Sequence, residues 1–255
     1  MKRRRSLVVG AAIAIAIVGL VPSAAMGSHS WNGYHWARTS NPFTLRLGDN
    51  VSAVWDGHLA TTSSDWSKST VLNTRIASSN KNPRSCRPTS GRVEVCSATY
   101  GNTGWLGVAQ IWVTGGTHIR QGSVKVNDTY FRTGTYNSSA WRNLVMCQEV
   151  AHTLGLDHQD EDFDNPNLGT CMDYTSNPTS NQHPNAHDYA ELEEIYEHLD
   201  SFTTVGSAAR VGSRGAFTGA STWGRAAARA SGGRPTMYVR DLGRGNAVVT
   251  FVIWA

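Results

Sequence analysis

Hydrophobic and polar positions repeat with two different periods near the start of the chain, and these periods predict a strand followed by a helix. Residues 43–47 alternate apolar and polar side chains with period two, which is typical of a half-buried strand. From Val51 to Leu59 the apolar residues recur at helical spacing. We therefore expect a helix there, with Asp49 or Asn50 as its capping residue.

The middle of the chain predicts further strands. Residues 71–76 and 92–95 have the short apolar patterns of strands, and the run at 105–113 is almost continuously apolar. Such a run is expected of a central strand that is buried on both faces. Residues 124–127 alternate again, which fits either a strand near the edge of a cleft or an ordinary solvent-facing strand.

Two helices are predicted in the second half of the chain. Ser138 or Ser139 can cap a helix that continues into the polar segment beginning at Cys147. A last helix is expected at 191–199, because its apolar residues fall on one stripe. The first half of the pattern and these helices together indicate one large domain.

The ends of the chain differ in composition from this domain. Residues 1–27 have a basic start, an apolar run of about 15 residues and small residues at a cleavage position, which is typical of a signal peptide. We assign 28–200 to the main domain. Residues 201–233 are rich in Gly, Ala, Ser and Arg and are expected to form a weakly structured linker. A β-hairpin is predicted at 234–255.

The charge of the chain does not indicate a nucleic-acid partner. Four of the 23 Lys and Arg residues lie in the predicted signal peptide, and the remaining 19 balance the 19 acidic residues. Residues 201–255 are basic, but the main domain is acidic. A nucleic-acid-binding domain carries a basic surface, which the acidic main domain does not offer, so we expect no nucleic-acid partner. No second apolar run is long enough to span a bilayer, so we expect no stable membrane insertion.

Four cysteines in an exported chain indicate two disulfides, and three connectivities are open. Cys86 and Cys96 flank a turn-forming Pro-Thr-Ser-Gly sequence, which favours a local hairpin bridge between them. The pairing that remains is Cys147 with Cys171. We favour these two disulfides, Cys86–Cys96 and Cys147–Cys171, over the other two connectivities.

The segment from Cys147 to His158 carries the chemistry. Gln148 and His152 are four residues apart on the predicted helix and face the same way, with Glu149 beside them. Gly155 can adopt a positive φ and reverse the chain, so His158 can return to the same point. Two imidazoles, an amide and a carboxylate would then surround one metal ion.

This segment resembles the motif of the metzincin zinc peptidases, His-Glu-x-x-His-x-x-Gly-x-x-His, with Gln148 in place of the first histidine. Thr170 to Tyr174 resembles the methionine turn of that family, with Met172 at its centre, and residues 187–192 resemble the start of the C-terminal helix of the matrixins. The resemblance covers roughly residues 30–200. It implies an α+β, zincin-like catalytic domain with a twisted mixed sheet, an active-site helix and a C-terminal helix.

The resemblance also implies roles for the site residues. His152, His158 and Gln148 would bind one Zn²⁺, and Glu149 would act as the general base on a metal-bound water. Tyr174 would donate to the developing oxyanion, and Met172 would form an apolar floor beneath the ligands.

Other polar residues are weaker candidates for ligands. The loop 159–165 is acidic and could offer oxygens to Ca²⁺, but it lacks the alternating spacing of an EF-hand, so we expect a solvated loop. His58 is expected to be a surface or capping histidine. His118 is expected in a loop, where a histidine rarely has a chemical role.

Three functions are compatible with these features. The expected one is a secreted, extracellular zinc endopeptidase that acts as a monomer on protein or peptide substrates. The alternative is a catalytically impaired metzincin-like protein that binds a protein or a surface, and a third is glycan binding through the nine tryptophans. The presence of Glu149 favours the first, because a binding module needs no general base.

Overall fold

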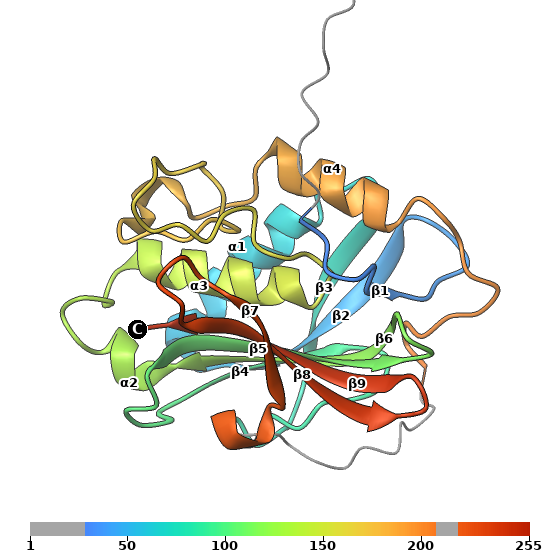
Figure 1. Ribbon diagram of the computed structural model, residues 1–255, viewed down its shortest axis with the longest axis horizontal. Coiled ribbons are helices and arrows are strands. Elements are labelled where there is room, and N and C mark those ends of the chain that lie inside the picture. Colours follow the sequence, from blue (N-terminus) through green and yellow to red (C-terminus); the bar gives the residue numbers. More distant parts are fainter. Residues whose placement is uncertain (1–28, 208–218) are drawn as a thin grey trace, which may run out of the picture.

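The computed structural model describes residues 29–207 and 219–255, so the predicted signal peptide lies outside the described residues. The architecture is mixed α/β, with one multistranded sheet and few helices. Helices α1, α3 and α4 lie on one side of the sheet (Figure 1). The helices and strands have the following bounds: β1 His35–Trp36, β2 Phe43–Asn50, α1 Ala53–Trp66, β3 Leu72–Ser78, β4 Val93–Ala98, β5 Trp105–Thr114, β6 His118–Asn127, α2 Asp128–Phe131, α3 Ser139–His152, η1 Pro178–Ser180, α4 Ala186–Ile195, η2 Ala220–Thr222, β7 Arg225–Arg229, β8 Pro235–Gly243 and β9 Asn246–Trp254.

The sheet is mixed, with strand order β3-β2-β4-β6-β5-β9-β8-β7, and β1 pairs with the start of β6. Strands β3, β2, β4 and β6 pair in parallel. From β6 onward in the sheet order, β5, β9, β8 and β7 each pair with antiparallel neighbours. The main core lies between the helices and the sheet, because α3 packs against β5, β6 and β9. A smaller cluster of Trp105, Val108, Trp223 and Val252 covers part of the sheet separately.

Several strand predictions are confirmed. The period-two segment at 43–47 lies in β2, the apolar segment at 71–76 lies in β3, and the buried run at 105–113 lies in β5. The predicted terminal hairpin is formed by β8 and β9, which pair closely up to Gly243 and Asn246. Local patterns predict these strands well because β2 alternates and β5 is buried along nearly its whole length.

The strand predicted at 124–127 is present, but its residues are buried and lie neither at an edge nor on a solvent-facing strand. These residues belong to β6, which lies between β4 and β5 in the interior of the sheet. Strand β5 is central, as expected, but only because β9 pairs with its outer side. The position of a strand in a sheet depends on long-range pairing, which a local alternation does not report.

The expected hairpin around the first disulfide is also wrong, although the Cys86–Cys96 disulfide itself is present. Cys96 lies in β4, whose neighbours β2 and β6 are both parallel to it, and Cys86 lies in the preceding loop. The second expected disulfide, Cys147–Cys171, is present too. Two disulfides are compatible with an extracellular location.

Helix boundaries differ from the predictions at two places. Strand β2 continues to Asn50, so the residue that precedes α1 is Ser52, without a side-chain capping bond. Helix α4 covers Ala186–Ile195 instead of 191–199, because the Asn185 and Asp188 side chains form a capping box that starts the helix earlier.

The basic segment predicted to be a weak linker contains ordered structure in its described part. Strand β7 at Arg225–Arg229 pairs antiparallel with β8, and residues 208–218 lie outside the described residues. The alanine-rich sequence of β7 has a low strand propensity, so the strand depends on pairing with β8 and could not be predicted locally. Across residues 29–207 and 219–255, no helix combines the length and apolar character needed to cross a bilayer.

Candidate metal centre

Helix α3 carries the central residues of the candidate site on its last turns. The Ser138 side chain accepts a hydrogen bond from the Trp141 N–H and so begins the helix, which ends at His152. Gln148 and Glu149 are fully buried, and His152 is 1% exposed. The polar side chains of the motif therefore lie inside the protein, between α3 and the sheet.

A glycine turn returns the chain towards the helix. Gly155 has a φ of 108°, and a Cβ at this position would lie 2.2 Å from the Tyr34 carbonyl oxygen. Only glycine tolerates both the conformation and the contact. Beyond the turn, His158 places its Nε2 atom 3.1 Å from Nε2 of His152.

The two histidines are oriented through their other ring nitrogens. His152 Nδ1 is 2.9 Å from the Leu156 carbonyl oxygen, and His158 Nδ1 is 2.7 Å from Oε1 of Glu161. A carbonyl and a carboxylate oxygen both accept hydrogen bonds, so each Nδ1 carries the hydrogen, and Nε2 is the ring nitrogen left to face the other histidine. Orientation of a metal-binding imidazole by a carbonyl or a carboxylate is the usual arrangement around zinc.

The facing lone pairs fit a cation. Two nitrogens that bind a tetrahedral zinc at 2.0–2.1 Å lie about 3.3 Å from each other, close to the separation of His152 and His158. Without a cation the two lone pairs would repel each other, and a proton on one Nε2 would replace this repulsion by a hydrogen bond. Burial, and then the neighbouring His158, lower the pKa of His152 well below its usual value, so a proton on the His152 ring itself is disfavoured.

Glu149 is a buried carboxylate without a hydrogen-bond partner among the described residues. The N–H groups of Ile253 and Ala109 face it and lower its pKa, but burial dominates and raises the pKa well above its usual value. The carboxylate occupies space left by Gly107 on β5, where a Cβ would lie 2.5 Å from Glu149 Oε1. Gly107 was not predicted, because a glycine inside an apolar run has no special local pattern.

The side-chain amide of Gln148 is buried and unpaired among the described residues. It lies one helical turn before His152, and its buried Oε1 and Nε2 atoms have no hydrogen-bond partner among the described residues. Buried side-chain amides are nearly always hydrogen-bonded, so an orphaned amide points to a missing group. An amide oxygen is a neutral ligand for a cation but a poorer donor to zinc than imidazole.

The segment predicted to be a methionine turn lies against the end of the motif. The Cys147–Cys171 disulfide joins it to α3, and the Met172 carbonyl oxygen accepts from the Gln159 N–H at 2.6 Å. Tyr174 is buried, and its ring lies 4.5 Å from that of His158. Burial raises the pKa of Tyr174 well above its usual value, so its hydroxyl remains a donor.

Strand β9 covers the site through three consecutive residues. The Phe251 ring stacks on His152 with centroids 4.2 Å apart and planes at 5°. The Val252 carbonyl oxygen accepts from the Tyr174 hydroxyl at 3.3 Å, and the Ile253 N–H faces Glu149. These residues pair antiparallel with residues 107–109 of β5, so β9 lies where an extended peptide would pair with that strand.

In the acidic loop after His158, aspartate side chains accept hydrogen bonds from the loop's own backbone N–H groups. Asp160 and Asp162 each accept the N–H of the residue two positions later, at 2.6 and 2.9 Å. Glu161 orients His158, and the donor atoms of Asp157, His158 and Glu161 lie within 4.8 Å of one another. This loop therefore supports the histidine site, a function that its composition did not predict.

The other two histidines considered from the sequence have different surroundings. His58 Nδ1 is 2.5 Å from Oδ1 of Asn143, so it joins α1 to α3 as a structural residue. His118 is the first residue of β6 rather than a loop residue, and its Nε2 is 3.1 Å from Oδ1 of Asp200.

No protein-family model and no curated protein sequence matches this chain. Among solved structures it is similar to high choriolytic enzyme 1, a hatching enzyme zinc-protease from Oryzias latipes (Medaka fish). The sequence identity is 12% and the TM-score is 0.34, and the match covers 64% of this chain and 94% of that chain. A match at this similarity does not define the chemistry of the site, which rests on its own residues.

Proposed function

We propose that the protein is a secreted zinc-dependent endopeptidase of the metzincin type. The observation that carries the proposal is the approach of His152 Nε2 and His158 Nε2 to 3.1 Å on a motif that also buries Glu149 without a partner. His152 and His158 would hold the metal, with the orphaned amide oxygen of Gln148 as the third ligand. The basic and apolar start of the sequence supports the export part of the proposal.

Zinc bound there would polarise the scissile carbonyl and lower the pKa of a bound water towards about 7. Glu149 would take a proton from this water and deliver it to the leaving amine as the C–N bond breaks. The burial that raises the pKa of Glu149 suits this use, because the carboxyl group must hold a proton between the two transfers.

The contacts of β9 support a peptide substrate. Tyr174 donates to the carbonyl oxygen of Val252, an extended residue that pairs with β5. A substrate peptide added to β5 would offer the same carbonyl to the same hydroxyl, and Tyr174 could then stabilise the oxyanion. We therefore propose that β9 occupies the substrate position in the resting protein and that a substrate must displace it.

A second candidate function rests on Gln148. Replacement of an imidazole ligand by an amide weakens zinc binding, and full burial of the site under β9 restricts access. A catalytically impaired metzincin-like protein that binds a protein or a surface would have these two properties. This second candidate function gives no reason for a buried Glu149 without a close partner, because an ionised carboxylate is costly inside a protein.

Hydrolysis of a peptide mixture by the purified chain, with and without a chelator, tests the proposal. We expect slow, chelator-sensitive cleavage that is lost in Glu149→Gln, by about 10²–10⁴-fold, while bound zinc is retained. Phe251→Leu removes the ring stacked on His152 but keeps an apolar side chain, and should raise kcat/KM several-fold.

The matched control is Phe131→Leu, the same change in α2, where the ring packs against Trp55 and leaves β9 and the motif untouched. It should not accelerate cleavage. Cleavage that survives in Glu149→Gln would contradict the proposed mechanism. Zinc binding with no cleavage in the wild type or in Phe251→Leu would select the second candidate function.

A further inference from the structure

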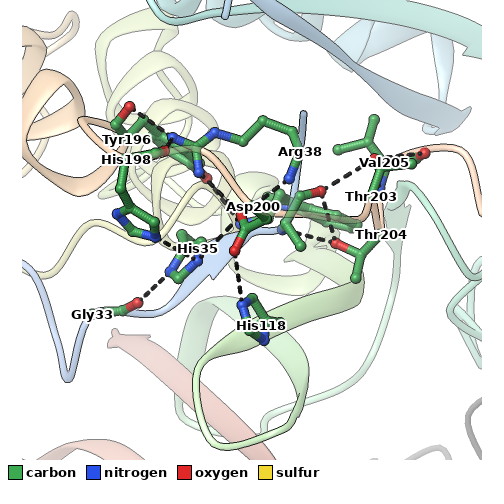
Figure 2. A network of polar contacts seen from close by, with 12 residues as sticks. Gly33, His35, Arg38, His118, Tyr196, His198, Asp200, Thr203, Thr204 and Val205 are labelled. Atoms are coloured by element: carbon green, nitrogen blue, oxygen red, sulfur yellow. Dashed lines mark hydrogen bonds and ion pairs between the residues drawn. The ribbon is translucent and has the colours of Figure 1, made fainter. Parts of the chain in front are cut away.

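A second group of histidines converges on one carboxylate, away from α3. His35 begins β1, His118 begins β6, and His198 and Asp200 follow α4. Figure 2 shows His35 and His118 directed at Asp200 and His198 beside His35, although their sequence positions are far apart. We call these four residues the Asp200 cluster. Two of its side chains are nearly buried: His35 is 6% exposed and Asp200 is 9% exposed.

The distances within the cluster are those of metal ligands. Nε2 of His35 and Nε2 of His198 are 3.3 Å apart, and Nε2 of His35 is 3.7 Å from Oδ2 of Asp200. The donor atoms of His35, His198 and Asp200 all lie within 4.8 Å of one another. Nitrogens bound to a tetrahedral zinc are separated by about 3.3 Å, which matches the two histidines.

The surrounding groups orient these ligands. His35 Nδ1 donates to the Gly33 carbonyl oxygen at 2.7 Å, so the neutral ring presents its Nε2 lone pair to His198. Arg38 donates to Asp200 Oδ2 at 3.2 Å and also to the carbonyl oxygens of Tyr196 and His198. Arg38 thereby fixes both the carboxylate and the backbone that carries the ligands, as partners of metal ligands commonly do.

We propose that the Asp200 cluster is a second metal site, which binds a divalent ion of the zinc class through His35, His198 and Asp200. His118 donates from Nε2 to Asp200 Oδ1 at 3.1 Å, so it orients the carboxylate and is not itself a ligand. Imidazole nitrogens with one carboxylate suit zinc, whereas Ca²⁺ and Mg²⁺ prefer oxygen ligands. Arg38 adds a positive charge nearby, and Asp200 compensates it with its own negative charge.

The site would have a structural function. It joins β1, the start of β6 and the segment after α4, three parts of the chain that no disulfide links. The neighbouring residue Trp36 donates from Nε1 to the Thr153 carbonyl oxygen at 2.8 Å, at the end of α3. A metal that holds β1 in place would therefore also support the base of the helix that carries the first site. This inference does not depend on peptidase activity.

The test is a zinc titration of the purified, metal-stripped chain by calorimetry, with the melting temperature followed in parallel. His198 is exposed, so His198→Gln should fold normally and bind one equivalent fewer than the wild type. Its remaining equivalent should be lost in the double variant that adds His152→Gln. The His152→Gln single variant should keep the equivalent bound by the Asp200 cluster and should still be stabilised by zinc.

The matched control is His183→Gln, an exposed histidine that pairs with Asp65 outside both histidine groups. It should bind as many equivalents as the wild type. In His152→Gln, the further change Asp200→Asn should weaken the remaining zinc by at least 10–100-fold. If His198→Gln and Asp200→Asn keep the wild-type number of equivalents, or if zinc does not stabilise His152→Gln, His35 and His198 share only a proton and the proposal is wrong.

Discussion

Two histidine pairs in the described part of the chain, one in each proposed metal site, have nearly the same spacing but different surroundings. His152 and His158 face each other at 3.1 Å, and His35 and His198 at 3.3 Å. Beside the first pair, the carboxylate oxygens of Glu149 are faced by the N–H groups of Ile253 and Ala109 but have no close hydrogen-bond partner among the described residues. Beside the second, both oxygens of Asp200 are bonded, to Arg38 and to His118. Equal ligand spacing can therefore serve two purposes, and the neighbouring carboxylate distinguishes them.

The difference is the reason for proposing a catalytic role for the first pair alone. A buried carboxylate without partners is costly, so its retention points to a function that needs a free base. A fully bonded carboxylate is a fixed structural group. The cover differs too, since β9 lies over the first pair, whereas His198 of the second is exposed.

The largest expected difference between the two histidine pairs is in how a change at Gln148 alters their zinc affinity. Gln148→His replaces an amide oxygen by imidazole and should tighten zinc binding at His152 and His158 by about 10–100-fold. A competition assay with a coloured chelator, made in the His198→Gln background, measures the first site alone. Gln182→His, outside both pairs, is the control and should leave the affinity unchanged. Equal affinities for Gln148→His and its parent would remove Gln148 from the ligand set.

A smaller effect is expected from the space that holds Glu149. Gly107→Ala places a Cβ 2.5 Å from Glu149 Oε1 and 2.8 Å from Val145 Cγ1, and should lower the free energy of unfolding by about 1–3 kcal/mol. Denaturant unfolding measures this loss, and the combination with Glu149→Ala should recover part of it.

The control is Gly57→Ala on α1, where a Cβ meets nothing within 4 Å and the substitution should stabilise the helix slightly. Zinc binding at the Asp200 cluster should be the same in both alanine variants. A loss in Gly107→Ala that Glu149→Ala does not reduce would show that the glycine acts independently of the carboxylate.

The smallest expected effect is a pair of opposite pH dependences in the metal-free protein. Burial raises the pKa of Glu149 in the folded state, so its contribution to stability is largest below its unfolded pKa and is lost as the pH rises. Glu149→Gln should therefore raise the melting temperature at pH 8 relative to the wild type, by about 3 °C or roughly 1 kcal/mol. At pH 4 the two proteins should melt at similar temperatures.

Asp200 should behave in the opposite way. Burial raises its pKa, but the hydrogen bonds from the Arg38 N–H and from His118 outweigh burial and hold the pKa below its usual value. Its contribution is therefore present above the unfolded pKa and is lost at low pH. Asp200→Asn should lower the melting temperature at pH 8 and have little effect at pH 3. The same sign for both variants at pH 8 would contradict the comparison.

Much of the local structure could be predicted from the sequence. Ser138 begins α3 as one of its two predicted capping residues, and the alternation at 43–47 lies in β2. These features depend on residues a few positions apart, where spacing translates directly into a face of a helix or strand. The roles proposed for Gln148, Glu149 and His152 come from the same short-range spacing.

The errors concern pairing between distant segments. The alternation at 124–127 indicates a strand but not its neighbours, and β6 proved to be an interior strand. Cys86 and Cys96 are close in sequence, yet β4 pairs with β2 and β6 instead of forming a hairpin. The Asp200 cluster joins residues 35, 118, 198 and 200, whose separations contain no recognisable spacing.

By itself, the sequence determined the helix that carries the motif, the turn at Gly155 and the types of side chain offered to a metal. These follow from local conformational preferences and from side-chain chemistry. The tertiary structure alone decided that β9 covers this site, that Gly107 makes room for Glu149 and that a second group of histidines meets at Asp200. The reason is that strand pairing and burial bring together residues that are far apart in the chain, and no local pattern records such contacts.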